Sequence, residues 1–148
     1  MNSEDKFKWI EFYKVADSYS NSNNPAELRS GISRFYYSAF GTCRDYIIDH
    51  RLWGNDDELK EIMTSKSSKV HEKTYEIFRD NHYLNRQLIG KKISRLLFDL
   101  REKRNDADYN SKMQHVNHNY NFVKARTKRL FKELENLGED FDIDFDSS

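Results

Sequence analysis

The chain has 148 residues, and its 25 basic and 25 acidic side chains give a formal net charge of zero. A chain of this length fits one domain that buries about two-thirds of its surface, so it needs no disulfide or metal to hold it together. Because the molecule as a whole is not a polycation, any binding of nucleic acid must depend on local clusters of basic residues.

One proline and five glycines interrupt a sequence rich in leucine, lysine, glutamate and arginine, which favours helices throughout. The single cysteine, Cys43, excludes an internal disulfide and is compatible with a reducing cytoplasm. The N-terminus lacks the pattern of a signal peptide, and no stretch approaches the roughly 18 apolar residues of a membrane helix. We therefore expect a soluble cytoplasmic protein without a membrane partner.

The first half of the chain predicts two helices. Aromatic residues spaced along residues 5–20 indicate an amphipathic helix that ends in the run S-N-S-N-N-P. A second helix is predicted over residues 25–50, with Asn24 as its cap and Pro25 at its first position. Gly31 and Gly41 lie inside that helix, where they indicate either a close approach by another helix or tolerated glycines.

The second half predicts three more helices and a tail. A polar connection after Gly54 leaves room for a short helical piece, and a third helix is predicted over residues 67–80, followed by a polar loop over residues 79–86. The fourth helix is predicted over residues 88–108. The fifth, over residues 111–137, carries a heptad seam that would run about 40 Å.

These elements predict an all-α fold, an up-down bundle of four to five helices that occupies residues 1–138. Residues 139–148, E-D-F-D-I-D-F-D-S-S, are acidic. They predict a flexible tail, either an interaction peptide or an inert solvated segment.

An arginine interrupts the apolar stripe of the fourth helix. Ile93, Leu96, Leu97 and Leu100 recur at helical spacing, and the same register continues to Arg104. A guanidinium keeps its charge, so at a buried or interfacial position it needs a carboxylate, carbonyl groups or a phosphate. Asp108, four residues on, is a candidate partner that would orient the guanidinium by an ion pair.

Other kinds of site have weaker signals. His115 and His118 are spaced to share a metal, but no third strong ligand follows at metal-ligand spacing, so ordinary surface histidines are the simpler interpretation. Glycine-rich phosphate loops and a nucleophile elbow do not occur in the sequence. We therefore expect neither a cofactor nor a metal.

Basic residues gather on the last two predicted helices. Such clusters with nearby aromatic rings suit single-stranded RNA, although a solvated helix face with ion pairs such as Arg95–Asp99 is the alternative. On the fourth helix these residues are Lys91, Lys92, Arg95, Arg101, Lys103 and Arg104, and on the fifth they are Lys124, Arg126, Lys128, Arg129 and Lys132.

Two motifs carry a family resemblance. The second helix contains R-S-G-I-S-R-F-Y-Y-S-A-F, and the fourth ends in L-R-E-K-R-N-D-A-D-Y. With these motifs the chain resembles the HEPN superfamily, and above all its small stand-alone prokaryotic members. The resemblance implies a helical homodimer that sets two copies of the late motif across a cleft.

The same resemblance implies one of two functions. Many HEPN proteins are metal-independent endoribonucleases of toxin–antitoxin, antiviral or CRISPR-linked systems, and others are inactive RNA-binding or assembly subunits. The implied partners are RNA, a second copy of the chain, and a cognate antitoxin or a larger defence-complex protein.

The active motif of the superfamily is an arginine, then usually a polar residue, with a histidine four to six residues beyond the arginine. Arg104 and Asn105 match its start, whereas Tyr109 stands where the shortest version has histidine. Arginine can stabilise the charge of the phosphorane, but a tyrosine of pKa near 10 is a poor proton acceptor at neutral pH. The candidate catalytic residues are thus Arg104, Asn105, Asp108 and Tyr109, with catalysis in question at Tyr109.

Overall fold

A computed structural model describes residues 6–145, and within that range every regular element is helical. Six α-helices and one 3₁₀ helix follow one another: α1 Ile10–Asp17, α2 Pro25–His50, α3 Asp57–Thr64, α4 Val70–Asp80, η2 Tyr83–Asn85, α5 Ile89–Tyr109 and α6 Val116–Asn136. The predicted all-α class is confirmed. The helix count exceeds the predicted four to five because α3, placed in the sequence only as a short helical piece, forms a helix of its own.

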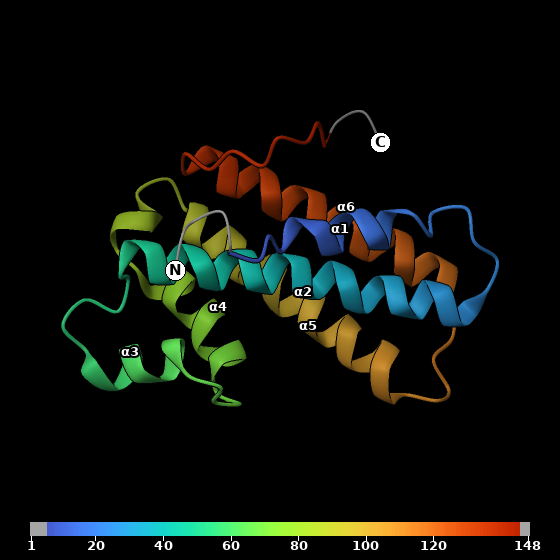
Figure 1. The fold of residues 1–148 in the computed structure, drawn as a ribbon, viewed down its shortest axis with the longest axis horizontal. Helices are drawn as coiled ribbons and strands as arrows, with labels where there is room; N and C mark the ends of the chain where they lie inside the picture. Colours follow the sequence, from blue (N-terminus) through green and yellow to red (C-terminus); the bar gives the residue numbers. More distant parts are fainter. Residues whose placement is uncertain (1–5, 146–148) are drawn as a thin grey trace.

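The helices pack around α2 and α5 (Figure 1). Helix α2 contacts α1, α5 and α6, and α5 contacts α2, α4 and α6. The short helix α3 lies beside α4 at one end of the molecule. Helices α2 and α5 are thus the two elements through which the others are connected.

Local chemistry sets the ends of the long helices. At the start of α2 the side chain of Asn24 accepts a hydrogen bond from the backbone N–H of Ala26 at 2.9 Å, and Pro25 follows, as predicted. Helix α6 begins five residues later than predicted. His115 adopts a left-handed conformation with φ of 54° immediately before it, so residues 111–115 form a loop.

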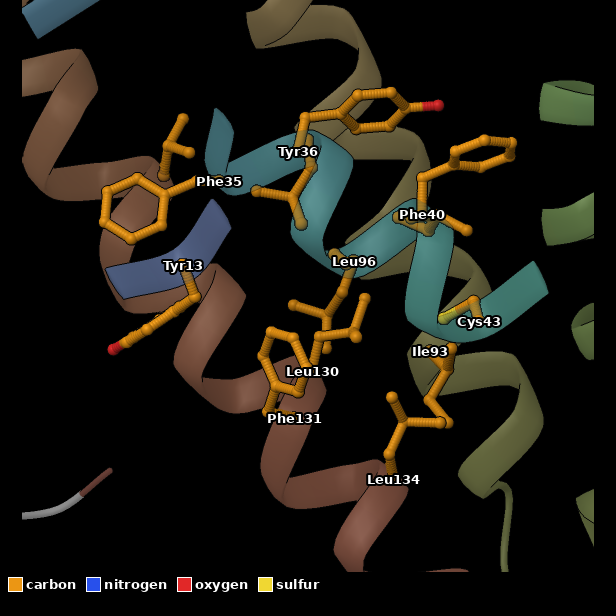
Figure 2. Close-up of a cluster of buried hydrophobic side chains, with 14 of the residues drawn as sticks. Tyr13, Phe35, Tyr36, Phe40, Cys43, Ile93, Leu96, Leu130, Phe131 and Leu134 are labelled. Carbon is orange, nitrogen blue, oxygen red and sulfur yellow. The ribbon is translucent and has the colours of Figure 1, made fainter. Parts of the chain in front are cut away.

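The core fills the space between α1, α2, α5 and α6 (Figure 2). Its members include Tyr13, Phe35, Ile93, Leu130 and Phe131. The predicted seam is buried from Tyr120 to Leu134, including Thr127, whose hydroxyl donates to the carbonyl of Val123 at 2.8 Å and is thereby satisfied. The single cysteine, Cys43 on α2, is also fully buried, and this burial raises the pKa of its thiol.

The two glycines inside α2 each allow an aromatic ring to lie against the helix. A Cβ on Gly31 would stand 2.6 Å from the ring of Tyr120 on α6, and one on Gly41 would overlap the ring of Trp9. Gly31 therefore permits the close approach of α6. Gly41 receives a ring from the segment before α1, so the close contact there is with a side chain.

The acidic segment at the C-terminus is packed as far as Phe145, contrary to the flexible tail that its composition predicts. Phe145 is 4% exposed and stacks on Phe131 of α6 with ring centroids 5.3 Å apart, while Phe141 meets the same ring edge-on at 4.9 Å. The alternation of acidic and apolar residues explains the difference. Every second side chain turns to the core and the aspartates face water. Residues 146–148 lie outside the described range.

Among residues 6–145, no helix combines the length and the apolar character that crossing a bilayer requires.

Replacing Phe145 with alanine should destabilise the fold. Because its ring is buried against Tyr13, Phe131 and Phe141, we expect Phe145→Ala to lower the free energy of unfolding by about 3 kcal/mol in urea denaturation. Tyr83, which is 68% exposed, provides the matched control, and Tyr83→Ala should change stability by less than about 0.5 kcal/mol. Equal stability of wild type and Phe145→Ala would show that the segment does not pack.

Candidate functional site: a buried arginine between α2, α4 and α5

Arg104 occupies the position that the apolar stripe of α5 predicts to be buried. Its side chain is 8% exposed. The guanidinium lies over the rings of Tyr36 and Tyr37 on α2, 5.1 and 5.3 Å from their centroids. Such cation–π contacts offset part of the cost of removing the charge from water.

The ion pair of Arg104 is weak. Its Nη1 lies 3.9 Å from Oδ2 of Asp108, well beyond the 2.7–2.9 Å of a charge-assisted hydrogen bond. Its Nε is buried and has no hydrogen-bond partner among residues 6–145. The predicted partner is therefore correct, but a nine-tenths buried cation keeps unused hydrogen-bonding capacity.

The two sequence motifs meet along antiparallel helices α2 and α5. Near the start of α2, Arg29 donates from Nε to the carbonyl of Ala107 at 2.7 Å and from Nη2 to that of Asn110 at 2.8 Å. One turn later the hydroxyl of Ser33 donates to Asp108 at 3.2 Å. Arg29 thus satisfies carbonyl groups at the end of α5, and Ser33 holds the carboxylate that faces Arg104.

Helix α4 adds a histidine to this cluster. His71 is half-buried, its Nδ1 lies 2.6 Å from the hydroxyl of Tyr36, and its ring stacks on Phe40 with centroids 4.1 Å apart. Burial first, and then the positive charges of Arg104, Arg101 and Arg44, lower the pKa of His71 to about 4. Burial also raises the pKa of Tyr36, so His71 and Tyr36 are both neutral at pH 7.

His71 is the residue of the cluster that the sequence does not single out. The signal available was indirect. Tyr36 lies on the apolar face of α2, and a buried phenol needs a hydrogen-bond partner. His71 directly follows Val70, the first residue of the apolar stripe of α4, but the sequence does not reveal that α4 packs beside Tyr36.

Of the other two predicted site residues, Tyr109 faces away from the guanidinium. Tyr109 is 77% exposed, and its position five residues after Arg104 puts it about 140° around the helix. Asn105 is half-buried next to Arg104 in sequence. The cluster therefore combines Arg104, Asp108, Tyr36 and His71, and it does not include Tyr109.

An open hollow of about 750 Å³ adjoins the cluster between α2 and α5. Tyr37 and Asp108, two of the groups that Arg104 contacts, line it together with Arg29, Ser33 and Arg34. The guanidinium of Arg104 does not line the hollow itself. It lies behind Tyr37, and the wall of the hollow carries two further arginines, Arg29 and Arg34. A phosphate or a second protein chain in the hollow would face this positive charge.

The basic residues of α5 and α6 divide into structural and solvent-facing groups. Lys124 is used structurally, since it pairs with Asp17 of α1 at 2.7 Å. The predicted Arg95–Asp99 pair forms at 3.6 Å.

Residues 6–145 contain no group of three His, Cys, Asp or Glu side chains that could hold a metal ion, so His115 and His118 have no third ligand there.

Comparison of the chain with protein-family models, with curated proteins and with solved structures gives no match. The case for a function therefore rests on the residues of the site.

The stability of the protein should depend on pH through His71. Between pH 6.5 and 4 the unfolded chain binds a proton at this histidine that the folded chain does not, so stability should fall as the pH falls through this window. We expect the melting temperature of His71→Asn, which cannot titrate there, to fall less steeply than that of wild type between pH 7 and pH 4.5. The exposed His118 provides the control, and His118→Asn should retain the slope of the wild type. Parallel curves for wild type and His71→Asn would contradict this assignment.

Proposed function

We propose that this chain is a HEPN-like, RNA-interacting protein of a prokaryotic defence or toxin–antitoxin system, and that it acts as a homodimer. The observation that carries the proposal is the buried guanidinium of Arg104 with its long ion pair and its unpartnered Nε. A buried cation of this kind is costly unless further groups compensate its charge. An RNA phosphate in the adjoining hollow, with or without a second copy of the chain, would lie one side chain from the guanidinium and would offset its charge through space.

In the catalytic form of this proposal, Arg104 stabilises the charge that develops on the phosphorane. Proton transfer then requires a group that is neutral at pH 7 and able to accept a proton. His71 belongs to the same cluster as Arg104 and is unprotonated at pH 7, but its pKa of about 4 makes it a weak base, so in this proposal the charge of the entering phosphate has to raise that pKa before His71 accepts the proton. Tyr36, hydrogen-bonded to Nδ1, would fix the orientation and tautomer of the His71 ring.

The alternative is a catalytically inactive HEPN-like assembly subunit of a larger defence complex. Two observations favour it: Tyr109, which replaces the histidine of the motif, points to solvent, and Arg104 already connects α5 to α2 within one chain. A third observation is Phe98 of α5, which is 41% exposed and in edge-on contact with Tyr75 of α4. These two rings form an aromatic surface between α4 and α5 that suits a protein partner.

The catalytic form predicts cleavage of RNA without a metal. Incubation of micromolar protein with mixed RNA and EDTA should yield fragments, and Arg104→Lys, which keeps the charge but loses the planar fork, should lower the rate about 100-fold. Arg79→Lys is the matched control, because Arg79 is exposed and paired with the neighbouring Asp80. Melting curves establish that each variant is folded. Intact RNA with the wild-type protein, alone and with a candidate partner, would remove the catalytic form.

The source of proton transfer is tested separately. If His71 serves, His71→Asn should lower the cleavage rate about 100-fold, while Tyr109→Phe should change it less than threefold. The reverse pattern, a severe loss in Tyr109→Phe alone, would assign proton transfer to the motif position. Tyr109→Phe removes only a hydroxyl, whereas His71→Asn removes a ring that stacks on Phe40, so circular dichroism and melting curves establish that each variant is folded before the rates are compared.

The assembly form makes a different prediction about the same arginine. If Arg104 serves a dimer or a partner, Arg104→Lys should shift the sedimentation coefficient toward that of a monomer or reduce partner retention in a pull-down, with no RNA cleavage by either protein. A wild-type protein that sediments as a monomer at tens of micromolar would contradict the homodimer.

A further inference from the structure

A second hollow, of about 320 Å³, lies on another side of α5, between its first turns and the middle of α6. Five basic residues line it, and Leu88 and Leu96 add apolar surface; the basic residues are Lys91, Lys92, Arg95, Arg126 and Arg129, and we call this hollow the basic pocket. Arg95 precedes Arg104 by nine residues, which places the two side chains about 180° apart around α5. The basic pocket is therefore separate from the Arg104 cluster.

The wall of the basic pocket is strongly positive. Within residues 6–145 no acidic residue lines it. Asp99 pairs with two of its arginines, 3.6 Å from Arg95 and 3.5 Å from Arg126, so one acid is shared by two cations at distances longer than a charge-assisted hydrogen bond. Asp80 attracts Lys91 electrostatically but does little to neutralise it, because both carboxylate oxygens of Asp80 accept hydrogen bonds from Arg79 at 2.8 Å.

The helix backbone adds to this charge. Helix α5 spans 21 residues, and its first turn has no acidic side chain. Lys91 and Lys92 lie there instead, where the aligned peptide dipoles already leave a partial positive charge. Cations at a helix N-terminus repel this charge, and a bound anion would relieve the repulsion.

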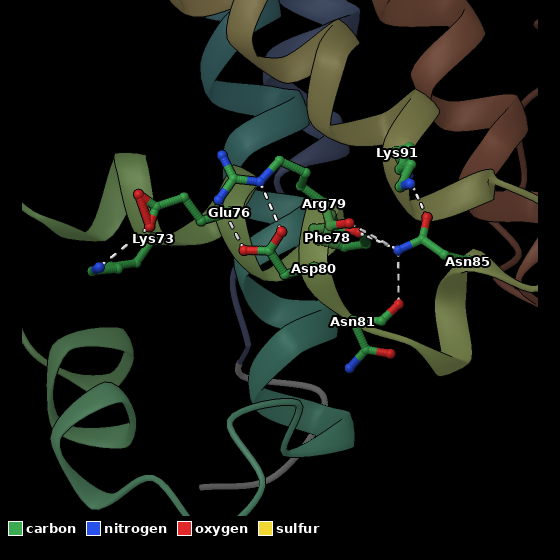
Figure 3. Close-up of polar contacts among 8 residues, drawn as sticks. All are labelled: Lys73, Glu76, Phe78, Arg79, Asp80, Asn81, Asn85 and Lys91. Carbon is green, nitrogen blue, oxygen red and sulfur yellow. Dashed lines mark hydrogen bonds and ion pairs between the residues drawn. The ribbon is translucent and has the colours of Figure 1, made fainter.

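The pocket is held in a defined shape. Figure 3 shows Asn85, whose amide donates to the carbonyls of Arg79 and Asn81 at 3.0 and 2.7 Å, and whose Oδ1 accepts from the backbone N–H of Lys91 at 2.8 Å. This residue fixes the first turn of α5 to the end of α4. On the other wall, the guanidinium of Arg126 lies 4.4 Å over the ring of Phe122. Arg126 therefore loses little conformational freedom on binding a ligand, while Asn85 fixes the backbone that carries Lys91.

The density of charge selects the class of ligand. Five cations around so small a volume match a group that concentrates several negative charges, and guanidinium groups bind phosphate through paired N–H donors. The carboxylates of an acidic peptide are spaced along its chain, and the acidic segment of this chain is anchored to α6 by Phe141 and Phe145. Leu88, 54% exposed beside the pocket, gives apolar surface next to the phosphates for a nucleoside.

We propose that the basic pocket binds the triphosphate group of a nucleotide, carried either by a free nucleoside triphosphate or by the 5′ end of an RNA. This site is independent of the Arg104 cluster, so the failure of either proposal leaves the other intact.

Titration calorimetry at about 150 mM salt tests the proposal, with tripolyphosphate and ATP as probes. We expect both to bind with micromolar dissociation constants, and we expect Lys91→Glu/Lys92→Glu to weaken binding at least tenfold. The control Lys60→Glu/Lys66→Glu changes the net charge equally at exposed sites and should bind as wild type does. Equal losses in both double variants, or no binding by wild type at millimolar probe, would overturn the proposal.

Two additional measurements complete the test. Arg129→Gln, at an exposed position of α6, should weaken binding several-fold and guards against a folding defect in the double variant. Fluorescence anisotropy with one RNA bearing either a 5′-triphosphate or a 5′-hydroxyl distinguishes the sources: tighter binding of the triphosphate form supports an RNA end, and equal RNA affinities with ATP binding intact support a free nucleotide. Normal binding of both probes by Arg129→Gln and by the Lys91/Lys92 variant would place the anion elsewhere.

Discussion

The contact between α2 and α5 is the constraint on which the site depends. Arg29 holds the carbonyl groups at the end of α5, Ser33 holds Asp108, and the rings of Tyr36 and Tyr37 receive Arg104. These contacts succeed one another along antiparallel helices, so each fixes the register for the next. The early and late sequence motifs are therefore two sides of one interface, and the buried charge is tolerated because that interface surrounds it.

The chemistry of the cluster follows from how little countercharge accompanies its cations. Arg44 is satisfied, since it donates to the carbonyls of Met63 and Ser65 at 3.0 and 2.7 Å. Arg101 and Arg104 both keep a buried Nε without a partner in the described part of the chain. Burial, and then the positive charge of these arginines, lowers the pKa of His71, and the same charge acts against the raised pKa of Tyr36. An anion that enters would change the protonation of His71 as well as the charge of the cluster.

Sequence periodicity predicted the long helices and the burial of Arg104 because both depend on one repeating stripe. It missed contacts that depend on how helices pack, such as the pairing of His71 with Tyr36 and the reach of Arg29 to the carbonyls of Ala107 and Asn110. The acidic segment differs from its prediction for a related reason: charge dominates its composition, while Phe141 and Phe145 determine its packing. The spacing of Arg95 and Arg104 already places them on opposite sides of α5, but the basic pocket depends on how α6 packs beside that helix.

Cys43 gives this fold a built-in reporter. It is the sole thiol of the chain, it is fully buried in the middle of α2, and its raised pKa keeps it protonated. Thiol reagents react with the thiolate, so modification must wait for α2 to separate from its neighbours. When reclosing is faster than the reaction, the labelling rate measures the free energy of that opening. Since α2 carries Tyr36 of the Arg104 cluster, a ligand that stabilises the cluster would slow the labelling of Cys43 without contacting it.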